Sequence, residues 1–262
     1  MVNRILLGLL ALLLTTCAVS PTGRQQFMMM NPQQMSAMGT QAFAELKDTT
    51  PVERNPRINA YVQCIASAIT RELGPGQEPW EVVVFRDEAV NAFALPGGKI
   101  GVNTGLLEVA DNQDQLAAVI GHEVGHVLAQ HANERASQQF AVQGGLAVVD
   151  ALYGSPGSPS QQALLQALGL GAQVGILLPY SRVHESEADQ IGLDLMARAG
   201  FDPRQSVALW ENMARASGGQ PPEFLSTHPA HGTRISDLRQ QLGPAMRAYE
   251  AARAMGKRPN CR

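Results

Sequence analysis

The sequence predicts an α+β fold that is mostly helical, with a small mixed sheet beside one central helix. Alanine, leucine and valine dominate the composition and aromatic residues make up only 5% of it, a balance that favours close helix packing over a β-sandwich. Apolar residues recur at helical spacing in several runs, most clearly over residues 115–130. Residues 91–107 instead predict two short strands joined by a Pro-Gly-Gly turn.

Residues 1–17 are expected to be a signal peptide and not part of the fold. Arg4 gives a positive start, and residues 5–14 form an apolar run that is too short to span a bilayer but suits a signal-peptide core. The run ends in Leu-Thr-Thr-Cys, which approximates a bacterial lipobox, although threonine before the cysteine is unusual. Lipidation of Cys17 is expected, and Ala18 after it implies the outer membrane. The alternative is a plain secretory signal that is cut nearby.

The remaining chain divides into an N-terminal extension over residues 18–50 and a main domain over residues 51–262. An extended stretch is expected over residues 20–31, and a short strand over 81–86. Helices are predicted over residues 32–46, 55–73, 115–130, 181–200, 202–213, 233–242 and 244–255. Two apolar stretches, 140–153 and 161–178, are each too short to cross a membrane. They predict either an internal helical hairpin or a lid over a cleft.

The charge balance excludes one class of partner. The chain carries 20 basic and 23 acidic residues, a net charge of −3, with no basic cluster. Nucleic acid is therefore not an expected partner. The mature chain of about 245 residues is large for one domain but within the range of an enzyme with a single core.

The motif His-Glu-Val-Gly-His at residues 122–126 points to metal chemistry. It lies in the helical run 115–130, which Asp111 or Asn112 can cap. Histidines four apart on a helix project from one face, so both His122 and His126 can bind one metal ion. Glu123 points towards the same side and can hold a water without being a ligand. This spacing is typical of zinc hydrolases, with Glu123 as general base.

A catalytic zinc site needs a third protein ligand. A metzincin would have a histidine at position 132, but that position is alanine and His131 is one residue out of register. The best candidates are two glutamates in the segment 181–189, which opens a second helix. Glu185 has an aspartate four residues on, at the same face, whereas Glu187 has an apolar residue there.

Glu185 is the expected ligand, and Asp189 is its expected partner in the second layer around the metal. A carboxylate in that layer fixes the tautomer of a ligating histidine, here His122. A solvated acidic helix N-terminus is the alternative interpretation. Replacement of Glu185 by alanine should therefore remove zinc, whereas the same change at Glu187 should not. Two residues are expected to be structural or to lie at the surface: His184 and Glu187.

These motifs together resemble a known family. His-Glu-x-x-His followed by a distant Ser-Arg-x-x-Glu-x-x-Ala-Asp is similar to the gluzincin metallopeptidases, which include the CaaX prenyl proteases and the bacterial heat-shock membrane protease. Their periplasmic lipoprotein branch is the closest resemblance. Residues 91–102 resemble the segment ahead of the metal helix, and Thr-His-Pro at 227–229 with Arg234 resembles a late motif. The similarity covers residues from about 20 to about 242, and it implies a zincin-like metallopeptidase domain over residues 51–262.

The resemblance gives further residues a role. The strand edge at Asn91 and Ala92 is expected to pair with an extended peptide substrate, the alternative being an ordinary hairpin. His228 is expected either to donate a hydrogen bond to an oxyanion or to act as a fourth zinc ligand, with Arg234 assisting. A turn histidine that caps the next helix is the alternative, and His231 is a weaker candidate for the same role.

The resemblance also implies a function. We expect a zinc-dependent endopeptidase with one zinc ion, in the periplasm and bound to the outer membrane through a lipid on Cys17. Unfolded or misassembled envelope proteins are its expected substrates. Two alternatives are a zinc exopeptidase and a chaperone-like or latent binding factor whose zinc site is closed.

The other two cysteines can form a disulfide in an oxidising compartment. A bond between Cys64 and Cys261 would tie the C-terminal tail to an early helix. It would close a loop of about 200 residues and add roughly 4 to 5 kcal/mol on the loop-entropy model. Two free thiols are the alternative.

Overall fold

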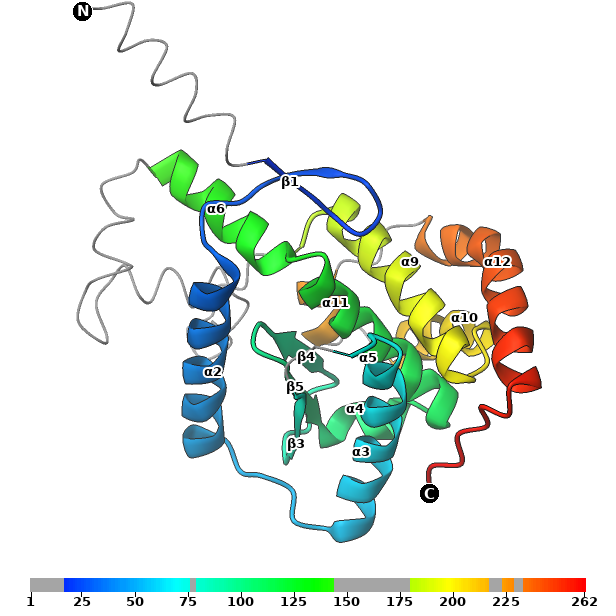
Figure 1. Ribbon diagram of the computed structural model, residues 1–262. Coiled ribbons are helices and arrows are strands. Elements are labelled where there is room, and N and C mark those ends of the chain that lie inside the picture. Colours follow the sequence, from blue (N-terminus) through cyan, green and yellow to red (C-terminus); the bar gives the residue numbers. More distant parts are fainter. Residues whose placement is uncertain (1–16, 76–78, 144–179, 217–222, 229–232) are drawn as a thin grey trace, which may run out of the picture.

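The structure is a computed structural model that describes residues 17–75, 79–143, 180–216, 223–228 and 233–262 (Figure 1). It is α+β and mostly helical, which confirms the predicted fold class. The helices are α2 (Pro32–Thr49), α3 (Pro56–Arg71), α4 (Thr104–Val109), α5 (Gln113–Leu128), α6 (His131–Gln143), α9 (Arg182–Ala199), α10 (Arg204–Ala216), α11 (Glu223–Thr227) and α12 (Arg234–Ala254). The strands are β1 (Cys17–Val19), β2 (Gln25–Phe27), β3 (Glu81–Phe85), β4 (Ala92–Leu95) and β5 (Lys99–Asn103).

Strands β3, β4 and β5 form the predicted small mixed sheet, in the order β3-β5-β4. Strand β3 runs parallel to β5, and β4 runs antiparallel to β5. The turn between β4 and β5 contains Gly97 and Gly98 at positive φ angles of 85° and 68°, where a residue with a Cβ would be strained. Within the described chain β4 pairs with β5 alone, so β4 is an edge strand of this sheet.

The sheet lies between α2 on one face and α3 with α5 on the other (Figure 1). Phe43 of α2 packs edge to face against Phe85 of β3, with ring centroids 6.1 Å apart. On the opposite face, Val102 of β5 is buried with Ile65 of α3 and Ile120 of α5. Side chains alternate between the two faces along each strand, so a strand of four or five residues contributes to both cores.

Helices α5 and α9 touch backbone to backbone. A Cβ added to Gly192 of α9 would come 2.6 Å from the backbone nitrogen of His122. A Cβ at Gly121 of α5 would come 2.8 Å from the carbonyl oxygen of Gly192. Glycine at both positions therefore permits the close approach. Helix α9 ends at Gly200, as predicted, with the left-handed φ of 91° that favours glycine.

The prediction of two separate C-terminal helices is wrong, because the single helix α12 spans both. Pro244 lies inside this helix and lacks the N–H that would bond the preceding turn. Pro244 is exposed, so water can hydrate the carbonyl that loses its partner. Leu238 and Ala245, on either side of the missing bond, are buried. Packing against the core thus keeps both halves in one helix.

Other differences from the predicted elements lie at short segments. Helices α4 and α11 and the start of α6 are not evident from the sequence. The stretch over residues 20–31, predicted to be extended, contains the turn and strand β2 of the hairpin β1–β2, and β1 precedes it. The apolar stretches predicted over residues 140–153 and 161–178 lie outside the described residues, apart from the end of α6. His231 also lies outside them.

The C-terminal tail is fixed to α3 and α5. Cys64 of α3 and Cys261 form a disulfide, with Cα atoms 5.7 Å apart. Gln113 of α5 binds the tail twice: its Oε1 accepts from the backbone N–H of Cys261 at 2.9 Å, and its Nε2 donates to the carbonyl of Pro259 at 3.0 Å. The covalent link and these hydrogen bonds hold the tail against the core.

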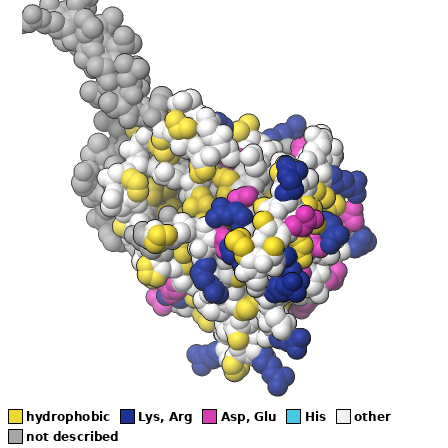
Figure 2. All heavy atoms as spheres, turned by 45° about the vertical axis from the view of Figure 1, so that its right-hand side comes forward, with side chains coloured by type: hydrophobic (Ala, Val, Ile, Leu, Met, Phe, Trp, Pro, Cys, Tyr) yellow, Lys and Arg dark blue, Asp and Glu magenta, His cyan; other side chains and the backbone are white. Residues whose placement is uncertain are grey.

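The surface mixes charges of both signs. On the face shown in Figure 2, basic and acidic side chains are interspersed among apolar ones. No histidine shows on this face, in keeping with the burial of every histidine that the structure describes. None of the described helices is both long enough and apolar enough to span a membrane.

Candidate active site

Helix α5 presents two histidines from one face. Asn112 caps the helix, because its Oδ1 accepts from the backbone N–H groups of Asp114 and Gln115, each at 3.0 Å. One turn separates His122 from His126, and their Nε2 atoms lie 3.0 Å apart. Both side chains are buried. The two imidazoles therefore point into one site, as their spacing predicts.

Helix α9 brings the expected glutamate to these histidines. Oε1 of Glu185 lies 3.4 Å from Nε2 of His126, and Oε2 lies 3.5 Å from Nε2 of His122. Glu185 is fully buried. Burial raises the pKa of its carboxyl, but the surrounding histidines, His228 foremost, lower that pKa well below its usual range. An ionised carboxylate thus faces the histidine pair.

His228 completes the cluster. Its Nδ1 lies 3.1 Å from Oε1 of Glu185 and 3.2 Å from Nε2 of His122. The ring of Phe224, from α11, stacks on that of His228 with centroids 4.5 Å apart. The structure therefore brings this predicted residue to the same point as the three expected ligands. The candidate ligand atoms of all four residues lie within 4.8 Å of one another.

Glu123 is buried beside the cluster without belonging to it. Its Oε1 makes no hydrogen bond within the described part of the chain and lies 3.5 Å from Nε2 of His228. Burial raises the pKa of Glu123, and the partial opposition from His228, His122 and the backbone N–H of Ala94 does not cancel that rise. A buried acceptor without a protein partner is suited to receive a hydrogen bond from a reactant.

Two residues behind the cluster hold the ligands in place. Oδ1 of Asp189 lies 2.9 Å from Nδ1 of His122, the contact predicted from the sequence. Arg234 donates to Oε2 of Glu185 at 2.7 Å and to Oδ1 of Asp189 at 2.6 Å. Its guanidinium carbon lies 3.7 Å from the ring centre of Trp210. These contacts favour a positioning role for Arg234 over the predicted help to an oxyanion.

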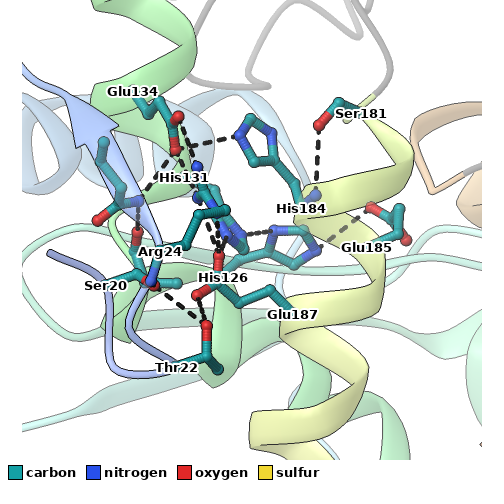
Figure 3. A network of polar contacts seen from close by, with 12 residues as sticks. Ser20, Thr22, Arg24, His126, His131, Glu134, Ser181, His184, Glu185 and Glu187 are labelled. Atoms are coloured by element: carbon teal, nitrogen blue, oxygen red, sulfur yellow. Dashed lines mark hydrogen bonds and ion pairs between the residues drawn. The ribbon is translucent and has the colours of Figure 1, made fainter.

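The second histidine of the pair, His126, is held by residues that the sequence interpretation missed (Figure 3). Its Nδ1 lies 2.9 Å from Nδ1 of His131, and Nε2 of His131 lies 3.1 Å from Oε2 of Glu187. The two histidines are five positions apart, which is the wrong spacing for one helix face. Gln130, between α5 and α6, has a φ of 51°, and this turn brings His131 back to face His126.

The N-terminal hairpin reaches the same residues. Arg24 donates through Nε to Oε2 of Glu187 at 2.9 Å, and through its two terminal nitrogens to Glu134 of α6 at 2.7 and 2.6 Å. Thr22 also donates to Glu187. Gln26 donates to Oε2 of Glu134 at 2.9 Å. The hairpin is therefore bonded to both α6 and α9 beside the metal ligands (Figure 3).

The electrostatics of this network are those of two ionised carboxylates. Burial raises the pKa of both carboxyls, but hydrogen bonds outweigh it. They lower the pKa of Glu187 to about 2 and that of Glu134 well below its usual range. Burial, assisted by nearby His184, lowers the pKa of His131 to about 4, so this ring is neutral at physiological pH.

Glu187 and His184 are both buried, at 5% and 3% exposure, so their placement at the surface is excluded. His184 lies 3.2 Å from Oε2 of Glu134, which joins it to the same network. The only sequence signal for these contacts is the presence of extra histidines and glutamates close to the two metal motifs.

The model of Peptidase family M48 matches residues 56–242, which include the whole metal cluster and Glu123. The chain belongs to Peptidase family M48. The M48 match confirms the gluzincin resemblance seen in the sequence. It begins at α3 and ends inside α12, so the hairpin β1–β2 and helix α2 precede it.

Curated relatives of this M48 chain come from two settings. It is 38% identical to "Mitochondrial metalloendopeptidase OMA1" of Schizosaccharomyces pombe over 187 residues, 71% of this chain and 53% of the relative. It is 32% identical to "Metalloendopeptidase OMA1, mitochondrial" of Bos taurus over 250 residues, 90% and 48% of the two chains. It is 28% identical to "Beta-barrel assembly-enhancing protease" of Escherichia coli (strain K12) over 212 residues, 78% and 43%. The chain thus spans about half the length of these relatives.

The side chains present fit the zinc ion of an M48 peptidase. Imidazole nitrogen and carboxylate oxygen are ligand types that zinc prefers, and a catalytic site keeps one position open for water. His122, His126 and Glu185 supply three ligands, and His228 lies where a fourth ligand or a substrate-facing donor would lie. The buried Oε1 of Glu123 beside them matches a catalytic site better than a structural one.

The remaining predicted residues lie at two places. Ala92 opens the edge strand β4, and the carbonyl of Asn91 before it accepts from the backbone N–H of Asn103 at 3.0 Å. Cys17 opens strand β1, so it belongs to the folded hairpin and not to the segment that precedes it. Their roles in substrate binding and lipidation stay predictions.

Proposed function

We propose that this M48 protein is a zinc-dependent endopeptidase. The observation that carries the proposal is the position of Glu123, a buried carboxyl with a raised pKa, beside the cluster of His122, His126 and Glu185. A structural zinc site is closed by four protein ligands and needs no such carboxyl. A catalytic site needs both the ligands and the base.

The proposed chemistry assigns one task to each side chain. A bound zinc ion supplies Lewis acidity, which makes a water more acidic and polarises a peptide carbonyl. Glu123 takes the proton of the attacking water and returns it to the leaving amine, a cycle that suits a carboxyl with a raised pKa. Nε2 of His228 lies 3.5 Å from Glu123, and this histidine is proposed to donate a hydrogen bond to the oxyanion that forms when water attacks the carbonyl. Arg234 keeps Glu185 and Asp189 in place.

The substrate backbone is proposed to pair with strand β4. As an edge strand, β4 offers main-chain groups to an extended peptide, which binds largely regardless of its sequence. The strand lies next to the proposed general base: the backbone N–H of Ala94 donates a hydrogen bond to the carboxyl of Glu123. Asn91 and Ala92, at the start of β4, would contact the same peptide.

A cavity of about 370 Å³ lies beside the metal ligands. Its size is within the range of small-ligand pockets, roughly 300–1,000 Å³. His126 and Tyr180, whose rings stack with centroids 4.0 Å apart, form one side. Ala94 and the β4–β5 turn form a second side, and the start of α2 forms a third. We assign this cavity to an apolar substrate side chain close to the scissile bond, because most of its lining is apolar: Pro32, Met35, Trp80, Ala94, Pro96, Gly97, Gly98, Val127, Leu128 and Ala132.

The proposed setting is the bacterial cell envelope, where the enzyme would degrade misfolded or misassembled periplasmic and outer-membrane proteins. Support comes from the signal-peptide pattern, from Cys17 as a lipidation site and from the similarity to beta-barrel assembly-enhancing proteases. The similarity to mitochondrial OMA1 proteins is at least as high, so the setting is tested separately from the activity. Labelling with a fatty-acid probe in a bacterial host should mark the wild type and not Cys17→Ser.

A latent form is the second candidate, and the position of His228 favours it. With Nδ1 3.1 Å from Glu185 and 3.2 Å from His122, this histidine can fill the fourth zinc position and exclude water. Full closure at all times would make the protein a binding factor. His228→Ala should then raise cleavage, whereas an oxyanion donor predicts that the same change lowers it.

The decisive test of the activity is Glu123→Gln. Gln keeps the size of the side chain but cannot accept and return a proton, so we expect full zinc content and loss of at least about 100-fold in casein cleavage. Metal analysis and a casein assay on both proteins measure the two quantities. A variant that cleaves casein at the wild-type rate removes Glu123 as the base, and cleavage only at chain ends would indicate an exopeptidase.

A further inference from the structure

We propose that Glu187, His131 and Arg24 form a positioning chain for the zinc ligand His126, so that the N-terminal hairpin is part of the metal site. The inference rests on the assignment of His126 as a ligand. It concerns residues that do not touch the reacting atoms.

The protonation of the imidazole rings of His126 and His131 connects the proposed ligand to Glu187. Nε2 of His126 faces the ligand cluster, 3.4 Å from Glu185, so a metal-bound ring carries its proton on Nδ1. That proton points at Nδ1 of His131, 2.9 Å away, which must then accept. The proton of His131 consequently lies on Nε2 and is donated to Glu187, 3.1 Å away. One tautomer of each ring satisfies the whole chain.

The carboxylate at the end of the positioning chain is held by the N-terminal hairpin. Glu187 accepts from Nε of Arg24 at 2.9 Å and from Thr22, both in the hairpin. Arg24 is itself fixed, because its terminal nitrogens bind Glu134 in a two-bond contact at 2.7 and 2.6 Å. Figure 3 shows these side chains converging from the hairpin, α6 and α9.

The turn between α5 and α6 places His131. Gln130 adopts a φ of 51°. This conformation is unfavourable in free energy for a residue with a Cβ, and it persists only where its surroundings impose it. Gln26 of the hairpin donates to the carbonyl of Ala129 at 2.6 Å, directly before this turn. The hairpin therefore contacts the chain at both the turn and the terminal carboxylate.

The hairpin is outside the family match, which begins at residue 56. Its contacts with Glu187 nevertheless reach the proposed ligand His126 through two further hydrogen bonds. Groups that orient a ligating histidine typically change metal affinity by 10- to 100-fold when removed. The positioning chain thus predicts that metal affinity depends on residues more than 30 positions before the matched region.

The experiment measures the zinc dissociation constant of the full-length protein by competition with a chromogenic chelator. His131→Phe, which keeps a ring but removes both hydrogen bonds, should weaken zinc binding by about 10- to 100-fold. Glu187→Gln, which keeps the shape of the side chain but not its charge, should weaken it in the same direction. Arg24→Lys should retain more affinity than Arg24→Ala.

Glu134→Gln is the matched control. Glu134 binds the same arginine as Glu187, but within the part of the chain that the structure describes it makes no hydrogen bond with His131 or His126. Gln at position 134 can still accept from Arg24 and leaves Glu187 and His131 in place, so zinc affinity should fall by less than in Glu187→Gln. If Glu134→Gln weakens zinc as much as Glu187→Gln, the hairpin acts only through general stability and the proposal fails.

Thermal unfolding of each variant in the presence of a chelator reports folding independently of zinc. Should His131→Phe not fold, Glu187→Gln decides the question, and wild-type zinc affinity in a folded Glu187→Gln overturns the proposal. The readout does not depend on proteolysis. A wild type that binds zinc but cleaves nothing would remove the proposed function and leave this inference standing.

Discussion

The two histidines proposed as zinc ligands, His122 and His126, are supported in different ways. His122 is bonded directly to Asp189, four residues after the glutamate ligand on the same helix. Arg234 binds both carboxylates from behind. All of these residues lie inside the M48 match, so the support for this ligand comes entirely from the family domain.

His126 is supported over a longer path. One further histidine, His131, separates it from its carboxylate, Glu187. The arginine that fixes this carboxylate, Arg24, comes from the hairpin before the family domain. Direct support needs the crossing of α5 and α9 with Arg234 from α12, whereas indirect support needs a hairpin, a strained turn and helix α6. The metal centre thus has a local half, which is the support of His122, and a long-range half, which is the support of His126.

The largest difference should appear between substitutions at the two glutamates of α9, the proposed ligand Glu185 and the positioning residue Glu187. Glu185→Gln removes the charged ligand but can still accept from Arg234, so we expect stoichiometric zinc to be lost on dialysis. Glu187→Gln should keep one zinc per chain at saturating metal and show only weaker affinity. Metal analysis after dialysis, with and without added zinc, measures both.

If Glu187→Gln loses zinc at saturation while Glu185→Gln keeps it, the two roles are exchanged. Alanine at position 185 is a poorer test, because it leaves the buried guanidinium of Arg234 without one of its carboxylates. An uncompensated buried charge of this kind destabilises a protein by about 3–5 kcal/mol.

Asp189→Asn tests the local half. The change keeps the side-chain volume but removes the negative charge that orients the ring of His122. Zinc affinity should fall by about 10- to 100-fold, as much as for the indirect half or more. Competition with a chelator measures it, and His131→Phe is the natural comparison. An unchanged dissociation constant would show that the ring of His122 is fixed by the helix crossing alone.

Local patterns in the sequence predict the local half well. Helical spacing places His122 and His126 on one face, and it places Glu123 beside them. The choice of Glu185 over Glu187 follows from the same rule, since only the former has an acidic residue four positions on. The structure brings each of these residues to the predicted place because a single crossing of two helices determines the arrangement.

The long-range half cannot be predicted in this way. His131 faces His126 only because Gln130 adopts a left-handed conformation. This conformation cannot be predicted from the sequence, because residues other than glycine rarely adopt it. Arg24 lies in a hairpin of short strands, where 110 residues separate it from Glu134. The sequence does not predict the continuous helix through Pro244 for a related reason. Tertiary packing keeps the helix continuous, although proline locally favours a break.

Acid should weaken the contact between the hairpin and α6. Hydrogen bonds to His184, Arg24 and Gln26 lower the folded-state pKa of Glu134, against burial. A depressed pKa contributes stability above the unfolded value of about 4.3, and this contribution is lost as the pH falls below it. We expect the wild type to lose urea resistance as the pH falls from about 5 to about 3 more steeply than Glu134→Gln. Urea midpoints of the metal-free proteins measure this, and parallel pH curves would show that Glu134 is not ionised in the fold.

The smallest effect concerns the contribution of α2 to the cavity, the other place where the segment before the family domain meets the active site. Gln33→Trp should narrow the cavity from its exposed rim. The variant should then cleave substrates with a large apolar side chain at one fixed position from the scissile bond less well, with kcat/KM lower by about tenfold. Mass spectrometry of the products maps the cleavage sites. Gln41→Trp, on the same helix but outside the lining, is the control and should leave the preference unchanged. Equal loss for small and large side chains would mean that α2 affects the rate without shaping specificity, because a pocket that selects by size cannot treat both alike.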